Sequence, residues 1–136
     1  MNEVIEFEVA DLRERYEVDV DGGAEPTFTH VIVRDWPIPS DAYTKETTDT
    51  LIRVPQKYPN QAPDWIFVEP DLRVVKTGER PKDSYHDNTG GQVKLNGWLA
   101  LSYHVTRLDN FQWQPYETDL LWYVDVFTAM RFRNGD

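Results

Sequence analysis

Cysteine is absent from this chain of 136 residues. Its absence excludes disulfides, thiolate metal sites and thiol nucleophiles. Long hydrophobic runs are also lacking, because no apolar stretch approaches the ~18 residues of a membrane-spanning helix. The acidic start of the chain does not have the basic-then-apolar order of a signal peptide. We therefore expect a cytoplasmic protein with no membrane partner.

Basic residues are scarce: 14 Lys and Arg stand against 24 Asp and Glu, which gives a formal net charge of -10. Because neutralising phosphates requires clustered Lys and Arg, we expect no nucleic-acid partner. The acidic excess is strongest in residues 1–25, which contain nine acids and two arginines. A solvated acidic face is the simpler interpretation, and a docking site for a basic partner is the alternative.

Aromatic residues are plentiful, at 13% of the chain with five tryptophans, and hydrophobic residues make up 40%. This composition predicts a folded globule with an aromatic-rich core. The length is usual for one domain, and no repeat or linker divides the chain. We therefore expect a single domain over residues 1–136.

The hydrophobic pattern predicts an α+β fold. Helical spacing favours a helix over residues 3–15, although Ile5, Phe7 and Val9 also alternate as in a strand. A turn is expected at Asp21-Gly22-Gly23. Segments rich in β-branched and aromatic residues predict a four-stranded antiparallel meander, with strands at 16–20, 29–36, 49–55 and 64–70.

The second half of the chain predicts a long loop and a C-terminal helix. Residues 71–96 have the composition of turns, so we expect an exposed loop there, of a length that is often functional. The clearest helical pattern covers 117–133, with Thr118 as the expected N-cap. One stripe of this helix is expected to contain Leu120, Val124, Phe127 and Arg131, with Leu121 and Thr128 beside it.

Several short motifs follow one another along the chain: Trp36-x-Ile38-Pro39, Tyr58-Pro59, Pro63-Asp64, Ser102-x-His104, Trp113-x-Pro115 and Asp119-Leu120. Their order resembles the ubiquitin-conjugating enzyme superfamily. It is more closely similar to family E, a cysteine-less prokaryotic branch found beside genes for ubiquitin-like, ubiquitin-activating-like and metalloprotease proteins. The resemblance covers nearly the whole chain.

The resemblance implies a ubiquitin-conjugating-like fold and a place in a bacterial modification pathway. It implies a ubiquitin-like modifier and a ubiquitin-activating-like enzyme as partners, and no cofactor. The residues that it implies as fold markers are Tyr58, Pro59, Pro63, Trp113, Pro115 and Asp119.

Ser102 stands eleven residues before Trp113, in the segment where the superfamily carries its modifier as a cysteine thioester. The first hypothesis is that Ser102 accepts the C-terminal acyl group of the modifier as an oxyester. A free hydroxyl is a poor nucleophile and needs a base, for which His104 is the candidate. Residues i and i+2 of an extended chain face the same side, with their Cα atoms about 6.5 Å apart. The resemblance makes Asn88, together with His86, the candidate for stabilising the oxyanion or shaping the loop.

Other interpretations stay open. An inactive variant would bind a ubiquitin-like protein or scaffold the activating enzyme, with Ser102 as a strand-edge hydroxyl and His104 as a satisfied histidine. A free-standing Ser-His hydrolase is disfavoured, because the sequence shows no nucleophile elbow and no third triad member. Metal catalysis is disfavoured too, since His30, His86 and His104 show no ligand spacing; we expect no metal site and interpret His30 as a plain strand residue.

Overall fold

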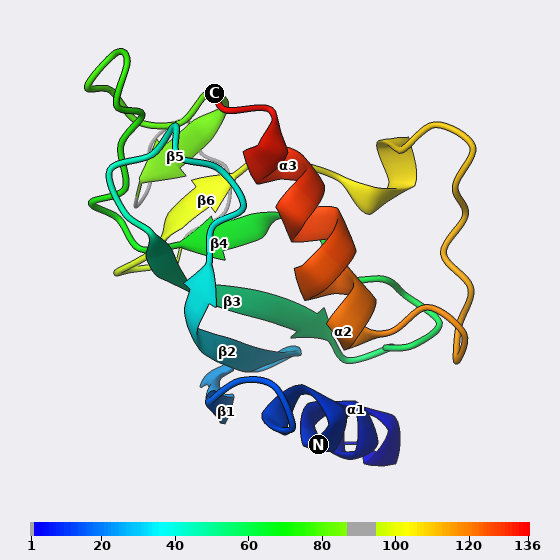
Figure 1. Ribbon diagram of the computed structural model, residues 1–136. Coiled ribbons are helices and arrows are strands. Elements are labelled where there is room, and N and C mark those ends of the chain that lie inside the picture. Colours follow the sequence, from blue (N-terminus) through cyan, green and yellow to red (C-terminus); the bar gives the residue numbers. More distant parts are fainter. Residues whose placement is uncertain (1, 87–94) are drawn as a thin grey trace.

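The computed structural model of the chain describes residues 2–86 and 95–136. Among these residues the strands form one six-stranded antiparallel sheet in the order β1-β2-β3-β4-β6-β5 (Figure 1). The strands are β1 (Val18–Glu25), β2 (Phe28–Pro37), β3 (Thr47–Pro55), β4 (Ile66–Val68), β5 (Ser84–His86) and β6 (Leu99–Leu101). The α+β class is confirmed, but the sheet has two strands more than the predicted meander.

The first helix, α1 (Glu3–Arg13), confirms the helical interpretation of the opening residues. Asn2 begins it, because the Asn2 side chain accepts a hydrogen bond from the backbone N–H of Ile5. The predicted turn at Asp21-Gly22-Gly23 is wrong. These residues belong to β1, where the pairing register with β2 shifts, and the turn follows Glu25.

The C-terminal helix crosses the sheet in three parts: α2 (Leu120–Trp122), the π-helical η3 (Tyr123–Thr128) and α3 (Ala129–Arg133) (Figure 1). Its N-cap is Asp119, whose carboxylate accepts from the backbone N–H of Trp122, and not Thr118 as predicted. The Thr118 hydroxyl is engaged one turn earlier, where it accepts from the N–H of Gln114. Among the described residues, no helix is both long and apolar enough to traverse a bilayer.

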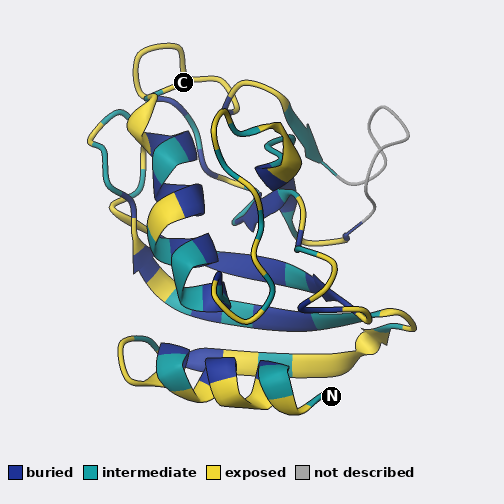
Figure 2. Cartoon of the chain, turned by 90° about the vertical axis from the view of Figure 1, so that its right-hand side faces the viewer, coloured by how far each residue is buried: buried dark blue, intermediate teal, exposed yellow. Residues whose placement is uncertain are grey.

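The main hydrophobic core lies between the helices and one face of the sheet. Both α1 and the C-terminal helix alternate buried and exposed residues along their length (Figure 2). The predicted stripe of the C-terminal helix, Leu120, Val124, Phe127 and Arg131, is buried. Strand residues of this core alternate with those of a smaller cluster on the opposite face, which contains Leu51, Phe67, Leu95 and Ala100.

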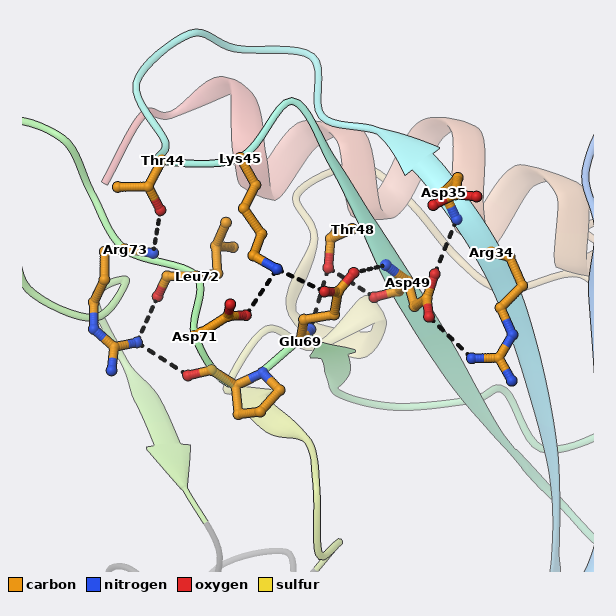
Figure 3. A network of polar contacts seen from close by, with 11 residues as sticks. Arg34, Asp35, Thr44, Lys45, Thr48, Asp49, Glu69, Asp71, Leu72 and Arg73 are labelled. Atoms are coloured by element: carbon orange, nitrogen blue, oxygen red, sulfur yellow. Dashed lines mark hydrogen bonds and ion pairs between the residues drawn. The ribbon is translucent and has the colours of Figure 1, made fainter.

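Polar contacts hold the far end of β4, after Val68, against β3 (Figure 3). The Glu69 carboxylate accepts hydrogen bonds from the backbone N–H of Asp49 (2.8 Å) and from Lys45 Nζ (2.7 Å). The N–H of Glu69 donates to the hydroxyl of Thr48. These contacts tie the C-terminal end of this three-residue strand to β3.

Candidate functional site

Ser102 and His104 follow directly on β6 and continue its alternation. Leu101 and Tyr103 belong to the main core under the C-terminal helix, where Tyr103 packs against Phe127 with 4.9 Å between the ring centroids. His104 remains extended, with φ -125° and ψ 123°. Successive residues of an extended chain point to opposite faces of the sheet. Ser102 and His104 therefore both face away from the core that holds Leu101 and Tyr103.

The start of β4 brings a third residue to the same place. β4 and β6 are antiparallel, with Ile66 opposite Leu101. Residues just before β4 therefore lie across from residues just after β6, although nearly 40 positions separate them in sequence. Asp64 reaches His104 through this register.

The three side chains form one hydrogen-bonded chain. Ser102 Oγ lies 2.9 Å from His104 Nε2, and His104 Nδ1 lies 2.8 Å from Asp64 Oδ1. A carboxylate can only accept, so Nδ1 carries the ring proton, and the Nε2 of a neutral ring then accepts from the serine hydroxyl. We call Ser102, His104 and Asp64 the Ser102 triad. This arrangement suits nucleophilic attack by an oxygen with a neighbouring general base.

The peptide after Asp64 is held in an unusual conformation. Trp65 has a φ of 63°, which is strained for a bulky residue. The hydroxyl of the buried Tyr123, in the π-helical turn, donates to the Trp65 carbonyl at 2.6 Å. Burial, and to a lesser extent the Asp64 carboxylate, raises the pKa of Tyr123, so the phenol keeps its proton and remains a donor. The C-terminal helix thereby fixes the backbone that carries the third triad member.

The Trp65 indole covers one flank of the imidazole. Its ring meets that of His104 edge-on at 5.4 Å and that of Tyr85 at 5.9 Å. On the serine side, the backbone N–H of Ser102 donates to the carbonyl of Asp83, whose φ of 58° is also left-handed. Strain of this kind persists where the surrounding structure fixes it, and it is concentrated at functional sites.

Solvent reaches the Ser102 triad from outside. Ser102 is half-buried, the side chain of His104 is 14% exposed and that of Asp64 is 49% exposed. A cavity of about 190 Å³ borders Asp64 and Trp65; its other lining residues are Phe28, Arg53, Pro55, Gln61 and Ala62. The triad is thus partly exposed to solvent, and a hollow adjoins its carboxylate end.

Two further histidines lie on other strands of the sheet. His86 lies in β5, where it pairs with Leu99. Asn88 lies outside the described residues. His30 is a β2 residue, and its Nε2 lies 2.7 Å from Glu25 Oε1. Across the described residues, no group of three or more His, Asp or Glu side chains is arranged to hold a metal ion.

The fold markers meet beside α1 and the start of the C-terminal helix. The Trp113 indole N–H donates to the Pro59 carbonyl at 2.8 Å, and its ring lies 5.9 Å from that of Tyr58. Pro63 is buried next to Asp64, Pro115 is half-buried in the turn that leads to the helix, and Asp119 caps that helix. The Tyr-Pro and Trp-x-Pro motifs are therefore in direct contact.

Asp64 is the site residue that sequence reasoning missed. No third triad member is recognisable in the sequence, and the structure places Asp64 at that position. Asp64 is visible in the sequence only as part of a Pro-Asp motif interpreted as a fold marker. Its role depends on the pairing of β4 with β6, and β6 was not predicted as a strand.

Comparison with known proteins gives the family. The profile of prokaryotic E2 family E matches residues 9–129, a range that includes all three residues of the Ser102 triad and both proline motifs. Neither a curated protein nor a solved structure gives a significant match to the chain. The chain belongs to prokaryotic E2 family E and is a ubiquitin-conjugating-like protein.

Proposed function

We propose that this protein carries a ubiquitin-like modifier on Ser102 as an oxyester and passes it to an acceptor. The observation that supports the proposal is the hydrogen-bonded chain from Ser102 Oγ through His104 to Asp64, with steps of 2.9 and 2.8 Å. This chain of hydrogen bonds provides the general base that a serine hydroxyl needs to become a nucleophile. A carrier that uses a cysteine thiolate does not require such a base. The family match supports a role in ubiquitin-like modification.

Loading would begin from the modifier thioester of a ubiquitin-activating-like enzyme. Ser102 Oγ attacks the acyl carbon while its proton moves to His104 Nε2. The carbon–sulfur bond breaks, and the departing sulfur takes the proton to leave as a thiol. In the second step an acceptor amine attacks the ester, gives a proton to Nε2, and Ser102 Oγ leaves and recovers that proton. Asp64 stabilises the imidazolium in both steps.

We place the reaction in the cytoplasm, with the modifier and its activating enzyme as protein partners. The acidic surface of α1 departs from the basic docking surfaces of the superfamily, so we do not transfer their docking mode to this chain. The hollow beside Asp64 and Trp65 offers room for a side chain of an arriving tail.

Reconstitution with the activating enzyme, modifier and ATP tests the proposal. We expect a covalent adduct on denaturing gels that resists thiol reductants and is cleaved by hydroxylamine. Ser102→Ala should abolish it, whereas Ser102→Cys should give an adduct that reductants now cleave, because it is a thioester. Ser84→Ala is the matched control: Ser84 lies opposite Leu101 in the adjoining strand, and its removal should leave loading unchanged.

Two results would contradict the carrier role. An adduct that persists in Ser102→Ala would place the acyl group on another residue. Absence of any adduct, together with a modifier complex whose affinity in calorimetry is unchanged by Ser102→Ala, would support the inactive, binding-only interpretation.

His104→Ala tests the histidine as the general base. This substitution should slow loading about 10²- to 10⁴-fold if the imidazole is the base.

A further inference from the structure

We propose that the Ser102 triad also transfers acyl groups to water, which makes this protein a hydrolase of activated esters and thioesters. The inference uses the same residues as the carrier function. It adds a reaction that a pure carrier avoids, since a carrier must keep its acyl group until the acceptor arrives. The geometry of the base and the access of solvent to it are the observations that support hydrolysis.

The base is retained after loading. In the free protein His104 Nε2 accepts from the Ser102 hydroxyl at 2.9 Å, and that proton is lost when the oxygen becomes an ester. Nε2 then has a vacant lone pair next to the ester. The hydrogen bond from Nδ1 to Asp64 does not involve the serine and still holds the ring in the same tautomer. The imidazole is therefore positioned to deprotonate whichever nucleophile reaches the ester carbon.

Solvent reaches the residues around this base. The side chain of His104 is 14% exposed, that of Asp64 is 49% exposed, and Ser102 is half-buried. Trp65 covers one flank of the imidazole. Hydrolysis of acyl enzymes requires a general base within hydrogen-bond reach of the attacking water, and this site provides one close to the ester.

The reaction balances without a further reactant. Ser102 Oγ displaces the leaving group from the acyl carbon, and the proton passes from Oγ through His104 Nε2 to the departing thiol or alcohol. Water then attacks the ester and gives one proton to Nε2. The bond from carbon to Oγ breaks, and Oγ takes that proton. The net reaction converts an ester or thioester and water into a carboxylic acid and an alcohol or thiol.

Two probes test this activity on the whole chain without any partner protein. A fluorophosphonate should phosphonylate one site, which mass spectrometry should identify as Ser102. p-Nitrophenyl acetate should release more than one equivalent of nitrophenol per chain. Ser102→Ala should abolish both signals, and His104→Gln should slow them about 10²- to 10⁴-fold. Ser84→Ala should match the parent protein in both assays.

The outcomes separate the hydrolase from the carrier. A single equivalent of nitrophenol followed by a stable acetyl-Ser102 would overturn hydrolysis and leave the carrier function standing. Turnover that survives Ser102→Ala would overturn it as well, because another group would be responsible. Continuous turnover that depends on Ser102, with no modifier adduct in the reconstituted system, would support the hydrolase and contradict the carrier.

Discussion

Asp64→Asn should lower the rate of Ser102 acylation by about 10⁴-fold, as loss of the charge from a Ser-His-Asp triad does elsewhere. The Asp64 carboxylate can only accept from His104 Nδ1, whereas an amide can also donate to it. A donated hydrogen bond moves the ring proton to Nε2, where it faces Ser102 and cannot accept the hydroxyl proton. The measurement is the second-order rate constant of fluorophosphonate labelling, followed by intact mass.

The control removes the same charge elsewhere. Asp71 forms an ion pair with Lys45 in the network of Figure 3, which contains no residue of the Ser102 triad. Asp71→Asn should leave the labelling rate within a factor of about two, as expected for an exposed ion pair that contributes little. An equal loss of rate in both variants would indicate a general effect of charge. Unchanged labelling in Asp64→Asn would remove Asp64 from the mechanism.

Of the three site residues, the two that are close in sequence were predicted from the sequence. Ser102 and His104 are two positions apart, and strand geometry alone brings such residues to one face. Asp64 required knowledge of a pairing between strands that are distant in sequence. Of the two strands in that pair, β4 was predicted, although longer than its observed three residues, and β6 was not.

The additional strands were missed for a physical reason. β5 and β6 have three residues each, and a pattern of period two cannot be recognised over so short a length. Both strands are formed by pairing: β6 is buried between β4 and β5 as Leu99, Ala100 and Leu101. For β5, tertiary context thus forms a strand inside a segment whose composition alone indicates a loop. The C-terminal helix, by contrast, has a long and regular stripe, and both the helix and the stripe were predicted.

The π-helical turn of that helix was also invisible in the sequence. It spans only six residues, too few for its wider period to show in the sequence, and only the contacts reveal it. Thr128 donates its hydroxyl proton to the carbonyl of Tyr123, five residues earlier, at 2.8 Å. The turn contains the phenol that binds the Trp65 carbonyl. Wide turns of this kind often occur at functional sites, which agrees with its position behind the Ser102 triad.

Glu8 connects three elements that the fold-marker motifs bring together. It is 7% exposed in α1, and its carboxylate accepts a hydrogen bond from the Tyr58 hydroxyl and another from the backbone N–H of Leu120 at 2.9 Å. Burial raises the pKa of Glu8, while these two hydrogen bonds oppose the shift. Burial and the neighbouring carboxylate raise the pKa of Tyr58, which keeps the phenol a donor.

Glu8→Ala should destabilise the protein strongly, because it leaves the Tyr58 hydroxyl and the Leu120 N–H buried without an acceptor. At about 1–3 kcal/mol for each unsatisfied group, we expect a loss of about 3 kcal/mol in the free energy of unfolding. A loss of that size should lower Tm by roughly 10 °C. Urea denaturation followed by tryptophan fluorescence measures the change. A loss below about 0.5 kcal/mol would show that water or a rearranged side chain replaces the carboxylate.

Unlike Glu8→Ala, Glu8→Gln should keep both hydrogen bonds, and its effect on the free energy of unfolding should depend on pH. Glutamine keeps an oxygen that accepts from both donors but carries no charge to desolvate. Because the folded-state pKa of Glu8 is raised, its stabilising contribution is complete below the unfolded value of 4.5 and is lost as pH rises through the folded pKa. The stability of Glu8→Gln relative to the parent should therefore increase from pH 4.5 to pH 8. Glu17→Gln, at an exposed position outside α1, should show no such trend. A constant difference across this range would mean that the buried carboxyl group titrates as it does in the unfolded chain.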